Sequence, residues 1–373
     1  MFYPQLFLSY GNFKTTVLIV PLLQLIMFGM GSQMSFDDFA GVIKVPKGVL
    51  VGSFGHYIIM PLTALLIVRV FNFPTEIAAG IILVGCVPNG LASNVMSLIC
   101  NANLVLAVAV SAVTTIVSPF VTPFLMKLIG GQYVEINVWS MMMDIINMMI
   151  FPIIAGFIFN LINAGKNTKR SRNIQLISYA VTILLANLIY MKVNQAGFSG
   201  YMIANAKALG FFFVLPIIAA LLFRHFLKGD VQLQKKILSL ISMVGIAVIV
   251  AVITAAGQEG LLAVGALLLL VVLLQNILGY VLGYNADRLF KLPKRDCRTL
   301  AFEVSMANGG LASGLALTMG NIATIGLAPA IYGPLMNVTG STLASWWRNK
   351  PLTPDGKRLL NEKNSKPSGD NKI

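Results

Sequence analysis

Long, mainly apolar segments dominate this chain, among them residues 15–34, 104–129 and 237–256. Each is long enough that, as a helix, it matches the hydrocarbon thickness of a bilayer, which takes about 20 residues. Only helices and closed barrels satisfy their backbone polar groups inside lipid, and these segments are too long and too evenly apolar for barrel strands. Charged residues form 11% of the sequence, against about 25% in soluble domains. We therefore expect an all-α polytopic membrane protein.

About eleven such segments can be drawn, each with the length of a transmembrane helix. They cover residues 15–34, 48–70, 76–100, 104–129, 139–162, 174–193, 204–227, 237–256, 261–289, 298–319 and 323–347. If the N-terminus lies outside, Lys and Arg gather in the loops on the inner side, as the positive-inside rule requires. The net charge of +14 is then explained by Lys and Arg in these loops, so no nucleic-acid partner is expected. The C-terminus is placed in the cytoplasm, and the polar, Lys-rich tail at 348–373 is expected to be disordered.

Two of the segments contain a break at mid-span. Residues 88–90, Pro-Asn-Gly, interrupt the third segment, and residues 308–310, Asn-Gly-Gly, interrupt the tenth. A shared Gly-Leu-Ala-Ser sequence begins at Gly90 and again at Gly310. The third segment runs inward and the tenth outward, a pattern typical of inverted-repeat transporters with two discontinuous crossing helices. Backbone groups freed at such breaks can hold ions and substrate, whereas a kink without a ligand is the simpler alternative.

A buried carboxyl accompanies the second break. Glu303 lies one turn before it, inside an apolar segment. An unpaired carboxylate at this depth is costly, so its expected partner is a cation or a proton, with a structural ion pair as the alternative. His56 lies within the second segment, where a lone histidine is usually packed and hydrogen-bonded. The three cysteines lack CxxC spacing, so neither a disulfide framework nor a zinc site is predicted.

The sequences around both breaks resemble a known family. Residues 84–94, Val-Gly-Cys-Val-Pro-Asn-Gly-Leu-Ala-Ser-Asn, resemble the first crossover helix of the bile acid:sodium symporter (BASS) family. Residues 298–308, Arg-Thr-Leu-Ala-Phe-Glu-Val-Ser-Met-Ala-Asn, resemble the second. Shorter matches lie at 27–31, 59–61 and 118–123, and the similarity covers roughly 13–162 and 235–347. The chain is identified as a member of this family, of bacterial type.

The resemblance implies two inverted five-helix repeats that form a core domain and a panel domain. Accordingly, we assign 1–47 to the first panel helix and its loop, 48–130 to the first core repeat, 139–256 to the panel helices and 261–347 to the second core repeat. Against that pattern, we expect this chain to lack the family's first helix and to insert a hairpin at about 174–227. We expect the hairpin to pack at the edge of the panel and to contribute no site residue, not even Asn187, Lys192 or Lys207.

The resemblance also implies the site residues. The cation would be bound by side chains of Ser93, Asn94, Ser111 and Glu303 and by carbonyls of Val304 and Met306, with His56 as a further candidate. The substrate would meet Leu91, Ala92, Asn308 and Asn337. Hydroxyl, amide, carboxylate and carbonyl oxygens suit a hard cation, so sodium is the expected coupling ion and the only metal.

Three positions depart from the family pattern. Ala107 stands where the first cation site usually offers a hydroxyl, and His56 and Ala307 stand where a second site usually has glutamines. A methyl group cannot ligate sodium, and imidazole nitrogen suits transition metals better than alkali ions. Two coupling modes therefore stay open: one sodium ion at the first site, or protonation of Glu303 or His56 in place of sodium.

We expect cation-coupled symport of an organic anion by alternating access, in the cell (inner, cytoplasmic) membrane. Bile acids, pyruvate-like acids and pantoate-like acids all remain open as substrates under the resemblance. Proton-coupled or uncoupled transport, or a channel, is the alternative within transport. A membrane-embedded enzyme is the rival from another class, but the chain has no HExxH or paired-aspartate motif, so no catalytic residue is assigned. Apart from the substrate and the lipid bilayer, no partner is predicted.

Overall fold

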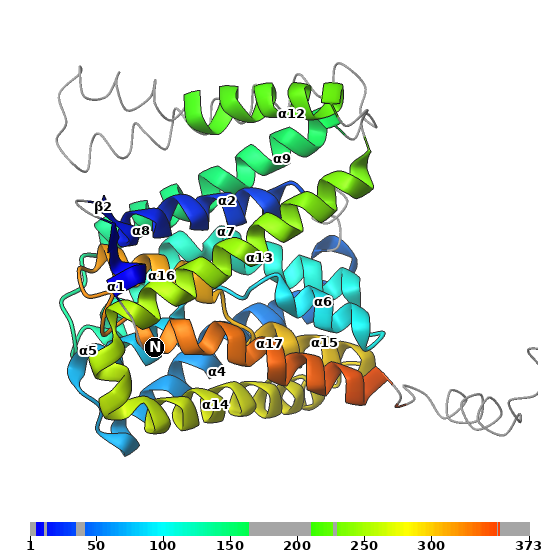
Figure 1. Ribbon diagram of the computed structural model, residues 1–373. Coiled ribbons are helices and arrows are strands. Elements are labelled where there is room, and N and C mark those ends of the chain that lie inside the picture. The colour runs from blue at the N-terminus through cyan, green and yellow to red at the C-terminus, as the bar shows by residue number, and fades with distance from the viewer. Residues whose placement is uncertain are drawn as a thin grey trace, which may run out of the picture.

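The computed structural model describes residues 5–10, 13–34, 42–163, 210–226, 230–348 and 350, and within them the chain is almost entirely helical (Figure 1). The elements of the first half are α1 (Gln5–Leu8), β1 (Ser9–Tyr10), β2 (Phe13–Lys14), η1 (Thr15–Leu18), α2 (Ile19–Gly31), α4 (Pro46–Phe71), α5 (Thr75–Cys86), α6 (Ala92–Ile99), α7 (Leu104–Leu125), η2 (Met126–Gly130), α8 (Val138–Ile145), η3 (Ile146–Ile150) and α9 (Phe151–Asn163). Those of the second half are η4 (Gly210–Val214), α12 (Leu215–Phe226), α13 (Val231–Ala256), α14 (Gln258–Leu289), α15 (Lys294–Ser305), α16 (Gly309–Thr318) and α17 (Leu327–Arg348).

The two predicted breaks are present where the sequence places them. The third apolar segment forms α5 and α6, and the tenth forms α15 and α16. The second segment becomes the single helix α4, although Pro61 lies inside it. Elsewhere the helix ends differ from the expected ones by about a turn, the usual uncertainty of a sequence-based boundary.

A short hairpin near the N-terminus is the one departure from the all-helical expectation within the described residues. Ser9 pairs with Lys14 and Tyr10 with Phe13, in antiparallel register. The residues between the strands are Gly-Asn, a pair typical of tight turns. This polar stretch precedes the first apolar segment, so no long helix competes for it.

Five described helical stretches are long and apolar enough to cross a membrane: Pro46–Phe71, Leu104–Gly130, Val138–Ile162, Lys236–Ala256 and Gln258–Leu289. The last two have the highest mean hydropathy, 2.8 and 2.6, yet only 28% of their most apolar windows is buried inside the protein. Apolar side chains that face outward on such helices require lipid rather than water. The protein is therefore a polytopic helical membrane protein, whereas the count of eleven helices and the inverted repeat remain predictions.

Helix packing brings distant parts of the chain together. Helix α2 packs against α9 and α13, while α4 packs against α5, α7, α14 and α15 (Figure 1). The α2–α9 contact is backbone to backbone: a Cβ added at Gly31 would lie 2.0 Å from the Ile153 carbonyl oxygen, and one at Gly156 would lie 2.0 Å from that of Phe28. Small residues at helix contacts allow this close approach in membrane proteins.

The first halves of the two broken helices lie at the centre of the protein. Every residue of α5 from Ile77 to Cys86 and every residue of α15 from Cys297 to Ser305 is buried. A helix that is buried on all sides has neighbours on every face, here α4, α14 and α17 among others. This central position places both breaks, and Glu303 with them, inside the protein.

The inserted hairpin is described in part. Its first helix, expected at 174–193, lies outside the described residues, as do Asn187, Lys192 and Lys207. The described part of its second helix, η4 and α12, packs against α9 (Figure 1). Apart from Arg348 and Lys350, the tail at 348–373 also lies outside the described residues.

Candidate cation and substrate site

The two breaks meet and bond to each other. Asn89 and Ala307 form an antiparallel bridge. The Gly90 N–H donates to the Met306 carbonyl (2.9 Å) and the Asn308 N–H donates to the Pro88 carbonyl (2.8 Å). Buried backbone groups need partners, and each break supplies those that the other has lost. The pairing leaves little space, since a Cβ at Gly90 would lie 3.1 Å from the Ala307 carbonyl oxygen.

The Glu303 carboxyl lies directly beside this crossing and is fully buried. Its Oε2 accepts hydrogen bonds from the Asn89 amide and from the Ser111 hydroxyl, the latter at 2.9 Å. Its Oε1 has no hydrogen-bond partner among the described residues. A buried oxygen without a donor is rare in proteins and calls for a ligand, an ion or a proton. The Glu303 carboxyl thus has an open position on one oxygen.

Other predicted cation ligands surround the same carboxyl. Ser111 on α7 also faces the Asn94 side-chain oxygen, 3.5 Å away. The Ser93 hydroxyl donates to the Gly90 carbonyl at 2.8 Å. Side chains from α6, α7 and α15 therefore converge where the sequence predicts one cation site.

The two predicted carbonyl ligands are engaged elsewhere. The Met306 carbonyl accepts the Gly90 N–H. The Val304 carbonyl faces His56 Nδ1 at 2.9 Å, while His56 Nε2 lies 2.8 Å from the Val87 carbonyl. His56 is fully buried, so it is packed and hydrogen-bonded, as expected of a lone membrane histidine.

Asn89 is a member of this cluster that sequence reasoning missed. It is buried, its amide donates to Glu303, and its side-chain oxygen accepts from the Thr114 hydroxyl at 2.8 Å. Thr114 thereby fixes which end of the Asn89 side chain faces the carboxyl. The signal was available, because Asn89 is the polar residue inside the Pro-Asn-Gly break itself.

A second buried polar network, also unpredicted, ties α15 to α14 and α17. The Asn276 amide donates to the Ser305 hydroxyl (2.9 Å), which donates to the Asn276 carbonyl (2.6 Å). The Tyr332 hydroxyl donates to the Ser305 carbonyl, and the Thr339 hydroxyl donates to the Asn276 side-chain oxygen (2.6 Å). Asn276 lies within a long apolar segment, which was the sequence signal for it. The network holds the C-terminal end of α15 in place.

The predicted substrate residues share one cavity. Leu91, Ala92, Asn308 and Asn337 all line a cavity of about 140 Å³ next to the crossing. Its other described lining residues are apolar side chains and glycines, and none of the described lining residues is charged. A larger cavity of about 550 Å³ shares the lining residues Ile246 and Asn337 with it. Asn308 also caps α16, since its side-chain oxygen accepts the Leu311 N–H at 3.0 Å.

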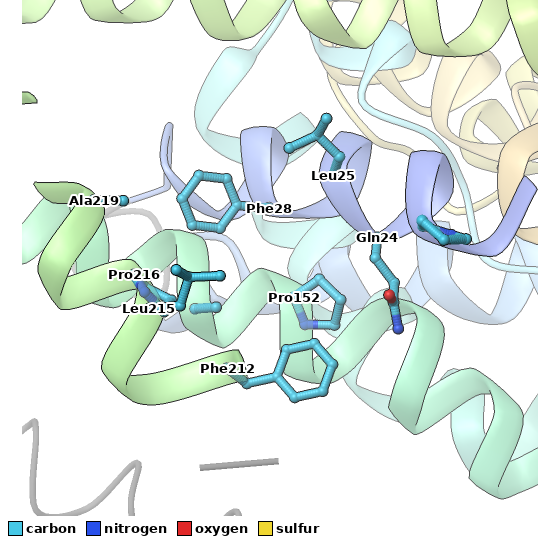
Figure 2. Close-up of a pocket in the computed structure, with 10 residues that line it drawn as sticks. Gln24, Leu25, Phe28, Pro152, Phe212, Leu215, Pro216 and Ala219 are labelled. Carbon is cyan, nitrogen blue, oxygen red and sulfur yellow. The ribbon is translucent and has the colours of Figure 1, made fainter. Parts of the chain in front are cut away.

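A separate apolar cavity of about 360 Å³ lies among α2, α9 and α12. Figure 2 shows Phe28, Pro152, Phe212 and the polar Gln24 around it. The Gln24 amide donates to the Asn147 carbonyl at 3.2 Å. This cavity shares no lining residue with the one at the crossing, so the described part of the hairpin stands apart from the predicted site.

Comparison with known proteins shows which family the chain is similar to. The profile of the Sodium Bile acid symporter family matches residues 20–198. The uncharacterized sodium-dependent transporter YocS of Bacillus subtilis (strain 168) is 30% identical over 349 residues, which cover 93% of this chain and 87% of the relative. The probable sodium/metabolite cotransporter BASS1, chloroplastic, of Oryza sativa subsp. japonica is 25% identical over 331 residues, which cover 88% of this chain and 66% of the relative. The BASS1 protein of Arabidopsis thaliana is 34% identical over 138 residues, which cover 37% of this chain and 34% of the relative.

These relatives are named as transporters, which points to a transporter rather than an enzyme. The first of them is matched over most of its own length, so the similarity extends well beyond the residues around the two breaks. The chain therefore belongs to the sodium bile acid symporter family.

Proposed function

We propose that this protein couples the inward movement of sodium to the uptake of an organic anion by alternating access. The observation that carries the proposal is the Glu303 carboxyl, which is buried at the crossing and has one oxygen without a donor in the described part of the chain. A sodium ion beside that oxygen would neutralise the carboxylate, and hydroxyl and amide oxygens of Ser93, Asn94 and Ser111 would complete its ligands. The relatives' names, which include sodium-dependent transport and sodium/metabolite cotransport, support the same ion.

The cavity beside the crossing supports an anionic substrate. It is lined by Leu91 and Ala92, the N-cap and first residue of α6, and by Gly309 and Gly310 at the start of α16. Helix N-termini carry partial positive charge and free N–H groups, which favour anions. Because no charged side chain lines it within the described part of the chain, these backbone groups and the amides of Asn308 and Asn337 are the polar contacts available to a carboxylate.

Alternating access requires two parts that move against each other. We assign α4 to α7 and α14 to α17, residues 48–130 and 261–347, to a core, and the helices within 1–47 and 139–256 to a panel. The cavity has lining residues from both, for example Met27 and Ile246 from the panel and Leu91 from the core. Movement between the two parts would open it to one side of the membrane and then to the other. We place the protein in the cell membrane, with its N-terminus outside and its C-terminus in the cytoplasm.

Reconstituted proteoliposomes test the proposal directly. A screen of organic anions by thermal shift, with and without sodium, selects the substrate, and its uptake is then measured under an imposed sodium gradient or an imposed proton gradient. Uptake driven by sodium alone is expected. Uptake driven by protons alone would favour the second candidate, in which Glu303 carries a proton instead of meeting a sodium ion. Uptake indifferent to both gradients would point to an uncoupled carrier.

A further inference from the structure

His56 lies between the ends of the two central half-helices. From α4, its fully buried ring places Nδ1 2.9 Å from the Val304 carbonyl oxygen and 3.1 Å from that of Glu303. On the other side of the ring, Nε2 lies 2.8 Å from the Val87 carbonyl oxygen. Val304 belongs to the last turn of α15 and Val87 follows the last residue of α5. Three carbonyl oxygens from two breaks thus converge on one side chain.

The breaks themselves release these carbonyls. If α15 continued as a helix, the Asn308 N–H would bond to the Val304 carbonyl, but it donates to the Pro88 carbonyl instead. Val87 is extended, with φ −75° and ψ 156°, so α5 ends there. Helix C-termini carry about half a negative charge each, and unwound carbonyls at transporter breaks coordinate cations. By its chemistry this is a second cation position, distinct from the Glu303 carboxyl.

We propose that the His56 ring occupies this position in place of an ion, so that the protein binds one sodium ion per cycle and not two. Ring nitrogens at 2.8–3.1 Å from the carbonyl oxygens leave no room for a cation between them, since oxygen ligands of a cation of this size lie at about 2.4 Å. The ring also links α4 to both breaks, as a bound ion would do.

The inference rests on the proposed sodium coupling, and the experiment separates the two. Equilibrium binding of ²²Na⁺ to the purified full-length protein counts ions per chain without any transport. One ion is expected for the wild type and none for Glu303→Gln. A His56→Gln variant replaces the ring by an amide oxygen beside the three carbonyls, so a second, weaker ion is expected to bind. His225→Gln is the matched control, because His225 is the second of two histidines and is exposed on α12.

The number of sodium ions bound per chain distinguishes a failure of this inference from a failure of the proposed function. Two ions bound to the wild-type protein would overturn the inference and leave the sodium-coupled function standing, whether or not the His56 variant folds. No ion bound to the wild type would overturn the proposed function, and the inference with it. A folded His56→Gln protein that still binds one ion with unchanged affinity would also overturn the inference. One ion in the wild type and in His225→Gln, rising to two in His56→Gln, supports it.

Discussion

Changing Glu303 to glutamine keeps the shape of the side chain and removes its charge. The glutamine oxygen can accept the same two hydrogen bonds, from Asn89 and Ser111. Its NH₂ group would replace Oε1, the oxygen that has no donor among the described residues. An unpaired buried amide costs about 1–3 kcal/mol, less than an unpaired carboxylate at membrane depth. The variant should therefore fold, and without sodium it should be at least as stable as the wild type.

The difference between the two proteins appears when sodium is added. A ligand at 100 times its Kd stabilises the folded state by about 2.7 kcal/mol, or a rise in Tm of roughly 5 °C at about 2 °C per kcal/mol. We expect this rise for the wild type and none for Glu303→Gln. Sodium-driven uptake should fall to background in the same variant.

Thermal unfolding in sodium chloride and in choline chloride at equal ionic strength measures this difference. Glu76→Gln is the matched control: Glu76 lies in the first turn of α5 and accepts hydrogen bonds from Asn321 (2.8 Å) and Thr324 (2.5 Å), away from the crossing. Its variant should keep the full sodium-dependent rise. A folded Glu303→Gln protein with an unchanged rise would refute the assignment of the ion to this carboxyl.

Three further changes test the geometry. Gly90→Ala puts a Cβ 3.1 Å from the Ala307 carbonyl oxygen, so we expect the two breaks to separate, with a loss of about 1–3 kcal/mol in unfolding free energy and weaker sodium binding. Tyr332→Phe removes the hydrogen bond to the buried Ser305 carbonyl, so the free energy of unfolding should fall by about 1–3 kcal/mol with one sodium ion still bound. Asn337→Ala, at the cavity wall, should raise the KM for the anion and leave ²²Na⁺ binding unchanged.

Each of these three substitutions has its own control or contradicting result. Gly210→Ala is the control for Gly90→Ala, because a Cβ at Gly210 meets none of the described residues within 4 Å. Equal stability of the two alanine variants would contradict the close approach at the crossing. A Tyr332→Phe protein as stable as the wild type would mean that the network around Asn276 does not hold α15. Loss of sodium binding in Asn337→Ala would contradict the separation of the cation and substrate positions.

Several features of the site could be predicted from the sequence because they are local. A Pro-Asn-Gly or Asn-Gly-Gly break inside an apolar segment ends a helix wherever it occurs, and a carboxyl at that depth needs a partner. The breaks and Glu303 follow from such rules, whereas Ser111 was implied only by the resemblance. Asn89, in the first break, and Asn276, within an apolar segment, were missed because the local sequence gives no sign of which distant group a polar side chain faces.

The sequence by itself determined that this is a helical membrane protein and where its helices are interrupted, because the bilayer fixes helix length and the breaks are properties of a few adjacent residues. Only the tertiary structure decided what the breaks do. Asn89 and Ala307 are far apart in the chain, and their pairing depends on how α5 and α15 pack among the other helices. The same packing brings His56 against carbonyls from both breaks. Contacts between segments distant in sequence arise from the packing of the whole chain, so no local pattern could specify them.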